Sequence, residues 1–453
     1  MGGYSIDDFK KLIVSKFESL RLHFKESDVV ESLLLLMFCR WQYGILMDEQ
    51  SSREGGRLIS LRDVVQRVAE EDGSSVFKGY FLKALQKNDL TMASDSKGGR
   101  LLVELWDELV RLSFNDQSEE GSLGECFEWL LSFFAEENMG RGGYFFTPSG
   151  IVSLIVKILD PKPGEKIYDP ACGSGEFLVE AINYVRRTSP DGELSILGRE
   201  MSPSVAFVAK TNVLIHGVVR NCIEVKSFLS GDGYNAKVSG RFDLAVANPP
   251  FSLRNWDGGE SGEFLRYGVP PQASADFAFI QNLLFSLNDE GRAAIIVPMG
   301  VLFRGGSEKT IREKMLRENN VEAILSIPSM SFYGTAIPAN ILFLRSRCAS
   351  GEVLFIDASS FFIKSQRLNR LDVDAVERLF CLYSDRKDVE GVARCVSIAE
   401  LEANGWDLTV SKYVVPAPSV SNESLAFLTE QQNKLEQELS FLQQEMRRLL
   451  SSL

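Results

Sequence analysis

The sequence predicts an α/β protein with a doubly wound sheet, preceded by an all-α region and followed by a heptad helix. From about residue 143, short β-rich runs alternate with helical patterns, as in sheets covered by helices on both faces. Before that point apolar residues recur at helical spacing, and near the end leucine recurs every seven positions. We therefore expect three parts: residues 1–138, 139–415 and 416–453.

Residues 1–138 are expected to form a helical domain. The segment "SDVVESLLLLMFCRW" offers Ser27 or Asp28 as a helix cap before an apolar run. "GRLLVELWDELVRL" and "GECFEWLLSFFAEEN" also have apolar side chains at helical spacing, and the second ends before the glycine-rich 139–143. No motif that carries chemistry occurs here, which favours a packing or docking domain.

The expected sheet consists of β-rich runs at 165–169, 194–200, 242–248, 292–298, 321–327 and 340–345. Between the second and third runs, Ser202 is the expected cap of a helix, Pro203 stands in its first turn and Gly217 ends it. The polar, Gly- and Pro-rich residues 252–275 predict a long loop, which is usually functional or mobile. Because doubly wound sheets bind ligands at the carboxyl ends of their strands, residues at those ends are candidates for a site.

Residues 416–453 predict one amphipathic helix with a heptad seam. One seam position holds Leu428, Leu435, Leu442 and Leu449, and the other holds Leu425, Leu439 and Met446, with Gln432 as a polar interruption. Such a seam is buried only against another helix. A partner chain is the favoured interpretation, and packing on the rest of the same chain is the alternative.

Composition limits the classes of function. With 45% hydrophobic and 25% charged residues the chain has the profile of a soluble globular protein, and its longest apolar run, 33–38, is too short to span a membrane. The N-terminus lacks the layout of a signal peptide, and the seven cysteines form no CxxC pair beside only two histidines. We therefore expect a cytoplasmic protein with reduced thiols, no metal site and no membrane contact. The net charge of −13 argues against broad electrostatic wrapping of DNA by this chain alone.

The first candidate binding element is "YDPACGSGEFL", residues 168–178. It follows an expected strand and opens an expected helix, and Gly173 and Gly175 allow a tight turn that comes close to a ligand. The segment lacks the GK[ST] of a phosphate-binding P-loop and the third glycine of a dinucleotide fingerprint. Asp169 at the strand end adds an anion, which suits a cationic ligand better than a pyrophosphate.

The next expected strand ends in Glu200. An acidic side chain at this point can accept hydrogen bonds from both ribose hydroxyls of a nucleoside. A lone glutamate is more often a solvated surface residue, but in series with the glycine turn it predicts a nucleoside-binding site.

The segment "FDLAVANPPF", residues 242–251, predicts a polar group held rigidly at a strand end. Pro249 and Pro250 cannot continue the ladder of hydrogen bonds, because proline has no N–H and a fixed φ. Asn248 is left at the carboxyl end of the strand, with Phe251 close behind. A simple strand-ending turn is the alternative.

Taken in order, Asp-Pro-Ala-Cys-Gly-Ser-Gly, Glu200 and Asn-Pro-Pro-Phe resemble the S-adenosylmethionine-dependent amino-methyltransferases of DNA. The segment 143–159 is similar to the cofactor-binding segment that precedes the glycine turn in the class whose cofactor region comes before its catalytic region. The segments 275–306, 333–344 and 353–362 resemble one family in particular, the methylation subunit of type I restriction–modification systems. The resemblance implies a Rossmann-like methyltransferase domain that acts as a site-specific, adenine-N6 DNA methyltransferase.

The resemblance also implies roles for individual residues. The Asn248 side-chain oxygen and the Pro249 carbonyl would accept the two amino protons of an adenine rotated out of the duplex, Pro250 would help to hold that geometry, and Phe251 would stack on the base. The residues that would bind S-adenosylmethionine are Tyr144, Phe146, Thr147, Pro148, Asp169, Ala171, Gly173, Ser174, Gly175, Glu200, Met201 and Asp232.

One stretch departs from the family pattern. The family usually has Gly-Asp on the strand after the ribose-binding one, and its Asp contacts the adenine of the cofactor. Here "IEVKSFLSGDGY" places Ser227 at the expected position and Asp232 five residues later. Either Asp232 takes the role or Ser227 makes a weaker contact.

The implied partners are DNA, a specificity subunit bound through the C-terminal helix, a second methylation subunit and a restriction subunit. Two alternatives remain open: a self-contained adenine methylase, as in solitary or phage-defence systems, and a cofactor-binding scaffold without activity. No segment of domain size is left over for sequence recognition, which argues against the first. The intact Asn-Pro-Pro-Phe argues against the second, although the altered stretch near Ser227 leaves it open.

Overall fold

The computed structural model describes residues 6–51, 97–112, 123–138, 146–218, 222–227, 229, 238–254, 256, 263–333, 335–366, 368–415, 432 and 434, and the structural statements below concern these residues. Tyr144 and Asp232 lie outside them, as does nearly all of the expected helix in 416–453. The predictions for these parts, and the expected boundary between residues 138 and 139, stay predictions.

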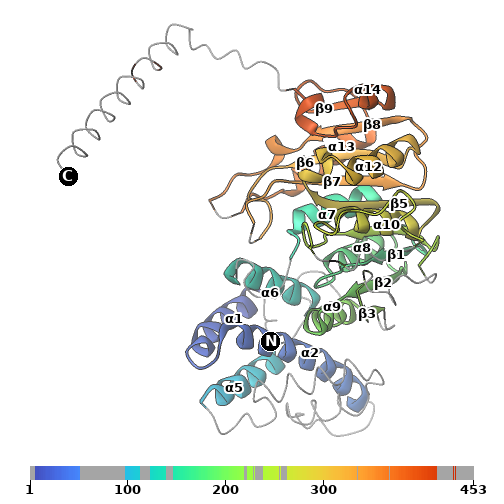
Figure 1. Ribbon diagram of the computed structural model, residues 1–453. Coiled ribbons are helices and arrows are strands. Elements are labelled where there is room, and N and C mark those ends of the chain that lie inside the picture. Colours follow the sequence, from blue (N-terminus) through green and yellow to red (C-terminus); the bar gives the residue numbers. More distant parts are fainter. Residues whose placement is uncertain are drawn as a thin grey trace.

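The N-terminal part of the described chain is helical (Figure 1), as expected. Its helices are α1 (Ile6–Arg21), α2 (Glu26–Ser51), α5 (Lys97–Arg111) and α6 (Leu123–Asn138). Their apolar faces meet in one core, in which Phe17 packs edge-on against Phe133 with ring centroids 5.3 Å apart.

The expected cap of α2 was wrong. The helix begins at Glu26, so Ser27 and Asp28 lie within its first turn. Acidic residues are favoured there as well as at the cap, because the positive end of the helix dipole attracts them. The sequence pattern could not separate these two positions.

A mixed sheet of nine strands forms the centre of the rest of the described chain. The strands are β1 (Lys166–Asp169), β2 (Ser195–Glu200), β3 (Ile223–Val225), β4 (Phe242–Ala247), β5 (Leu287–Pro298), β6 (Val321–Ile327), β7 (Ala339–Arg345), β8 (Glu352–Asp357) and β9 (Ala393–Ser397). Their order is β3-β2-β1-β4-β5-β7-β6-β8-β9, and β7 runs antiparallel to both of its neighbours. The chain order reverses between β1 and β4, so the carboxyl ends of these parallel strands border the crevice where doubly wound sheets bind ligands.

Helices cover both faces of the sheet, which confirms the expected fold class. One face packs against α7 (Ser149–Leu159), α8 (Glu176–Thr188), α9 (Pro203–Ile215) and α13 (Val373–Asp385). The other packs against α10 (Asp276–Ser286), α11 (Gly300–Phe303), α12 (Ser307–Arg317), α14 (Ile398–Ala403) and α15 (Val410–Tyr413). In β4, Leu244 and Val246 point to the first face and Ala245 and Ala247 to the second, as the two-residue period of a strand requires.

The six expected strands are all present, and only β5 differs by more than one residue at an end. β5 begins at Leu287, five residues before the expected start. Its pairing with β4 shifts register between Phe242 and Leu244, so the polar residues before Arg292 bulge out of the ladder. This interruption hides the start of the strand from the sequence pattern.

The N-terminal helices contact the sheet domain through α9. Phe38 of α2 packs against Phe207 of α9 with ring centroids 5.4 Å apart, and both rings belong to the core of the N-terminal helices. Arg370 also pairs with Glu136 of α6 at 2.7 Å. The two parts therefore share an interface that lies next to the binding elements of the sheet.

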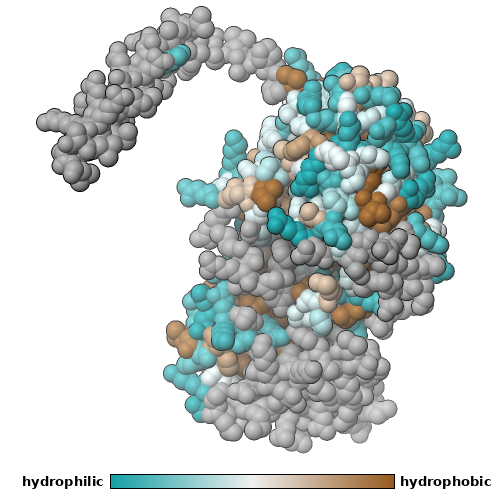
Figure 2. All heavy atoms as spheres, viewed as in Figure 1, coloured by the Kyte–Doolittle hydropathy of each residue, from teal (hydrophilic) through white to brown (hydrophobic). Residues whose placement is uncertain are grey.

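The described surface is mainly hydrophilic on the face seen in Figure 2, with apolar side chains in small separate groups. Large apolar side chains that are exposed include Met201, Phe303, Ile337 and Val373. Within the described ranges, no helix combines the length and apolar character needed to cross a bilayer.

Candidate active site

The turn between β1 and α8 has the backbone conformation that its glycines predict. Gly173 and Gly175 have φ angles of 55° and 87°, which residues other than glycine rarely adopt. The amide of Cys172 donates to the carbonyl of Arg199 at 2.9 Å, so the turn is tied to the neighbouring strand β2. Gly175 is also the N-cap of α8, whose free N–H groups therefore face the carboxyl edge of the sheet.

Asp169, at the end of β1, is almost fully buried. Its Oδ1 accepts a hydrogen bond from the amide of Ala171 at 2.9 Å. Burial raises the pKa of this carboxyl well above its usual range, the Ala171 hydrogen bond opposes the rise, and the nearby Glu176 and Glu200 add to it. A cationic ligand would stabilise the charged form of these clustered acids, so the cluster favours such a ligand.

Glu200 ends β2 and is half-buried. Its Oε1 accepts from the amide of Ser202 at 2.8 Å. Burial raises the pKa of Glu200, while hydrogen bonds from the amides of Ser202, Gly173 and Met201 lower it. Ser202 occupies the expected N-cap position of α9, but its side chain makes no capping hydrogen bond. Its hydroxyl lies 2.9 Å from that of Ser204 instead.

Asn248 follows the last residue of β4, where the sequence placed it. Its Nδ2 donates to the hydroxyl of Thr147 at 2.9 Å. This bond holds the amide in place, and with Nδ2 directed at Thr147 the Oδ1 atom is left to accept a hydrogen bond from a ligand. Pro249 is buried, and the exposed Pro250 continues the rigid turn.

Phe251 lies half-buried behind the prolines. Its ring meets that of Phe332 edge-on, with centroids 6.3 Å apart and an angle of 76° between the planes. Phe332 comes from the connection between β6 and β7, so this contact joins the Asn-Pro-Pro-Phe turn to a distant part of the chain.

These elements surround one cavity of about 310 Å³ at the carboxyl ends of β1, β2 and β4. The expected site residues that line it are Thr147, Asp169, Ala171, Gly173, Glu200, Met201, Asn248 and Pro250. Ser227 also lines the cavity, together with Lys226 and Leu229, whereas Asp232 lies outside the described residues. The structure thus brings Ser227, which stands at the position where the family has its Asp, to the wall of the cavity.

Other expected site residues do not line this cavity: they are Phe146, Pro148, Ser174, Gly175, Pro249 and Phe251. Ser174 is buried and hydrogen-bonds Glu176. Lining residues that the sequence analysis missed include Cys172, Glu176, Phe177, Val205, Leu253 and Phe279. Two of them, Cys172 and Glu176, directly follow an expected residue, which was the one available signal.

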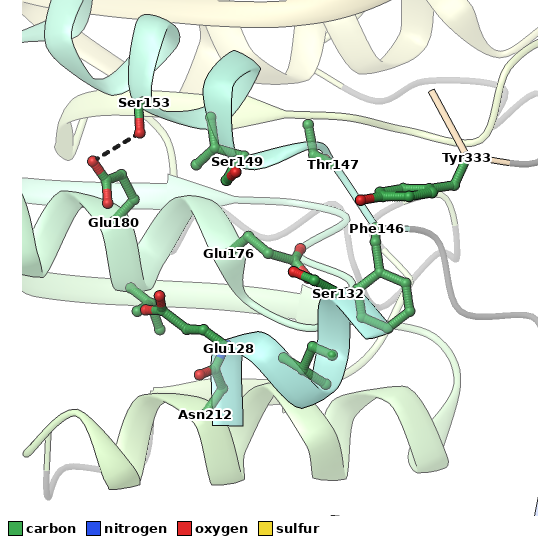
Figure 3. A pocket seen from close by; sticks show the side chains of 13 residues that line it. Glu128, Ser132, Phe146, Thr147, Ser149, Ser153, Glu176, Glu180, Asn212 and Tyr333 are labelled. Atoms are coloured by element: carbon green, nitrogen blue, oxygen red, sulfur yellow. Dashed lines mark hydrogen bonds between the residues drawn. The ribbon is translucent and has the colours of Figure 1, made fainter. Parts of the chain in front are cut away.

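A second cavity, of about 90 Å³, adjoins the first and shares Thr147 and Glu176 with it (Figure 3). It lies between α6, the start of α7, α8 and α9. Tyr333 reaches in beside Phe146, and Asn212 lies near Glu128. Phe146 therefore contacts this neighbouring space instead of the larger cavity.

Glu176 separates the two cavities. Burial raises its pKa to about 7, and the hydrogen bond from Ser174 opposes this rise. Glu180, hydrogen-bonded to Ser153 at 3.3 Å, adds a second half-buried carboxylate on the same helix. Among the described side chains, no group of three or more His, Cys, Asp and Glu is arranged to hold a metal ion.

A family model described as N-6 DNA Methylase matches residues 118–421, which is more than half of the chain. The chain belongs to the N-6 DNA methylase family. The match confirms the resemblance that the motifs indicated, and it includes the glycine turn, Glu200 and Asn248.

Curated relatives of this N-6 DNA methylase carry a more specific name. The MjaVII type I restriction enzyme methylase subunit of Methanocaldococcus jannaschii is 33% identical over 335 residues, which are 69% of this chain and 57% of the relative. The EcoKI methylase subunit of Escherichia coli is 28% identical over 339 residues, 69% of this chain and 61% of the relative. This chain therefore spans less than two thirds of the length of these two proteins.

A solved structure supports the fold. The methyltransferase subunit of a type I restriction–modification system from Streptococcus thermophilus has a TM-score of 0.73 to this chain at 23% identity, and the match covers 91% of this chain and all of that one.

Proposed function

We propose that this N-6 DNA methylase transfers a methyl group from S-adenosylmethionine to N6 of adenine in DNA, as the methylation subunit of a type I restriction–modification complex. The observation that carries the proposal is the Asn248 amide, which Thr147 orients at the wall of a cavity also lined by Asp169 and Glu200. The names of the curated relatives support the same assignment.

The donor set of the cavity fits S-adenosylmethionine. Asp169, Glu176 and Glu200 supply three carboxylates, against Lys226 as the one basic side chain among the described lining residues. This cofactor carries a sulfonium and an ammonium group, both cationic, and when bound it supplies an electrophilic methyl group. Glu200 stands where a carboxylate accepts from ribose hydroxyls. Ser227 and Leu229 line the same cavity and follow β3, the strand that pairs with β2.

Asn248 and Pro249 would activate the adenine amino group. The lone pair of that nitrogen is delocalised into the ring, which makes it a poor nucleophile. Two fixed acceptors, Oδ1 of Asn248 and the carbonyl of Pro249, would favour its pyramidal form and direct the lone pair at the methyl carbon. No general base is needed first, because the extra proton can leave the nitrogen after the methyl group has been transferred.

A separate specificity subunit would choose the DNA site. The net charge of −13 supports this division of labour, because an acidic chain is poorly suited to bind the DNA backbone over a wide surface by itself. The heptad pattern of 416–453 would supply the docking helix, and a second methylation subunit and a restriction subunit would complete a larger complex in the cytoplasm. The expected seam lies almost wholly outside the described residues.

A methyl-transfer assay tests the proposal directly. The chain is mixed with tritiated S-adenosylmethionine and DNA, with and without the neighbouring operon products, and the modified base is identified by mass spectrometry. We expect N6-methyladenine that depends on a specificity subunit. Asn248→Ala should abolish it, whereas Asn404→Ala, at the exposed end of α14, should not.

Each other outcome identifies a different function. Specific methylation by the chain alone would indicate a self-contained methylase. N4-methylcytosine would keep the fold and refute the substrate. Cofactor binding without methyl transfer in any combination would indicate a scaffold.

A further inference from the structure

Asp276, the first residue of α10, lies behind the Asn-Pro-Pro-Phe turn with only 2% of its surface exposed. Its Oδ1 accepts from the amide of Ser252 at 2.9 Å, and its Oδ2 accepts from the hydroxyl of Ser274 at 2.8 Å. Ser252 directly follows Phe251, so this carboxylate holds the outgoing end of the turn that carries Asn248.

The backbone at Ser252 needs such support. Its φ is +51°, in the left-handed region that residues with a Cβ adopt only at a cost. A residue keeps this conformation when the surrounding contacts demand it. The bond to Asp276 is one of these contacts, and the amide of Ala275, which donates to the carbonyl of Leu253 at 3.0 Å, is a second.

Arg304 completes the support. Its Nη1 lies 3.3 Å from Oδ2 of Asp276 and 3.5 Å from Oε1 of Glu308, and both of these acids have buried side chains. Its Nη2 donates to the hydroxyl of Ser252 at 3.4 Å. Arg304 thus neutralises two buried carboxylates and contacts the strained residue itself.

The arginine is in turn held from the far side of the domain. The carbonyl of Arg304 accepts from Nη1 of the buried Arg312 at 3.1 Å, and Nε of Arg312 donates to the carbonyl of Trp406 at 2.7 Å. The turn is therefore connected through hydrogen bonds to α12 and to Trp406, three residues after the end of α14. An anchor of this kind is rigid.

We propose that Asp276, with Arg304, is a positioning residue that fixes the Asn-Pro-Pro-Phe turn for methyl transfer. The inference rests on the proposed function of Asn248. The two prolines restrict the turn from within, but they leave its position relative to the cavity undetermined. Asp276 determines that position from outside: it binds the amide of Ser252, four residues beyond Asn248, and does not line the cavity. A misplacement of the reacting groups by about 1 Å can cost 100-fold in rate.

The test compares Asp276→Ala with Asp276→Asn in the full chain with its specificity subunit. The alanine variant removes both acceptors and should lower kcat by about 10- to 100-fold, with the Kd for S-adenosylhomocysteine changed less than twofold. The asparagine variant keeps an acceptor for the Ser252 amide and should recover part of kcat. Glu313→Gln, which removes an exposed partner of Arg317 on α12, is the matched control and should match the parent.

A double variant separates positioning from general damage. Glycine adopts the φ of residue 252 without strain, so Ser252→Gly should raise kcat when it is added to Asp276→Ala. Fluorescence of 2-aminopurine at the target position should show whether the base still leaves the duplex. Parent-like kcat in a folded Asp276→Ala protein would overturn the inference, as would a parallel loss of cofactor affinity. If the parent itself does not methylate DNA, the proposed function has failed instead.

Discussion

The hydrogen bond from Asn248 Nδ2 to Thr147 Oγ1, 2.9 Å long, gives the sharpest quantitative prediction. The bond holds the Asn248 side chain at the wall of the cavity and restrains its rotation. Because the Thr147 hydroxyl is a donor as well as an acceptor, it fixes the position of the amide and does not by itself select which end faces the base. Thr147→Val keeps the shape of a side chain that is 6% exposed and removes that acceptor.

The expected loss follows from the strength of one such bond. A neutral hydrogen bond contributes about 0.5–1.5 kcal/mol net, and about 1.4 kcal/mol corresponds to a factor of ten. Thr147→Val should therefore reduce kcat by about 2- to 10-fold. Loss of the amide itself in Asn248→Ala should cost about 100- to 1,000-fold, the scale for one preorganised polar contact.

The assay measures single-turnover methyl transfer at saturating cofactor and DNA. Under these conditions weaker cofactor binding by a Thr147 variant does not change the measured rate of methyl transfer. Thr147→Ser should retain most of the rate because the hydroxyl remains. Thr310→Val, on the exposed face of α12, provides the matched control.

A double-mutant cycle tests the reasoning. If Thr147 acts through the amide, Thr147→Val should cause no further loss in an Asn248→Ala background. Equal losses in both backgrounds would show that Thr147 affects the rate independently of Asn248, and the orientation argument would be wrong.

The remaining predictions concern cofactor binding by the Glu200 and Asn248 variants, the pH dependence of stability, and assembly with a specificity subunit. Glu200→Ala should weaken the binding of S-adenosylmethionine by about 1–3 kcal/mol in calorimetry, because a charge-assisted hydrogen-bonding group is lost. Undiminished affinity would show that Glu200 does not contact the cofactor. Asn248→Ala should leave that affinity nearly unchanged, since the amide faces the base, and a large drop would place it in the cofactor site. Glu176 has a pKa near 7 in the native state against an ordinary 4.5, so the native state binds the proton more tightly and stability should fall as pH rises from 4.5 to 7. Glu176→Gln should reduce this fall in thermal scans over the same range, and an unchanged pH dependence would contradict the assignment. Leu435→Lys combined with Leu442→Lys should abolish specific methylation and co-purification with a specificity subunit, while cofactor binding by the chain alone persists; normal assembly would move the docking surface to the N-terminal helices.

The candidate site was predictable where a residue follows a strand directly. Asp169, Glu200 and Asn248 each stand at or just after the end of a parallel strand, and the topology of a doubly wound sheet brings such ends together. Glu176 was missed because it follows the glycine turn on a helix, where an acidic residue usually caps or faces water. Only packing against α6 and the start of α7 encloses it.

Contacts across long sequence separations could not be read from the sequence. Thr147 and Asn248 are 101 positions apart, and Ser252 and Asp276 are 24 apart. Each partner has many polar alternatives in the chain, and a hydrogen bond forms only where the fold brings donor and acceptor within about 3 Å.

By itself the sequence determined the class of the fold, because the alternation of strand and helix patterns records which residues are buried on each element. It also determined which polar groups stand at the ends of β1, β2 and β4 and the shape of the turns after β1 and β4, since glycines and prolines impose local backbone geometry without help from distant residues. The tertiary structure decided that β7 inserts antiparallel between β5 and β6, where a connection without a helix can return the chain only in the opposite direction. It also decided what holds the Asn248 amide in place, because only the folded chain brings the Thr147 hydroxyl beside it.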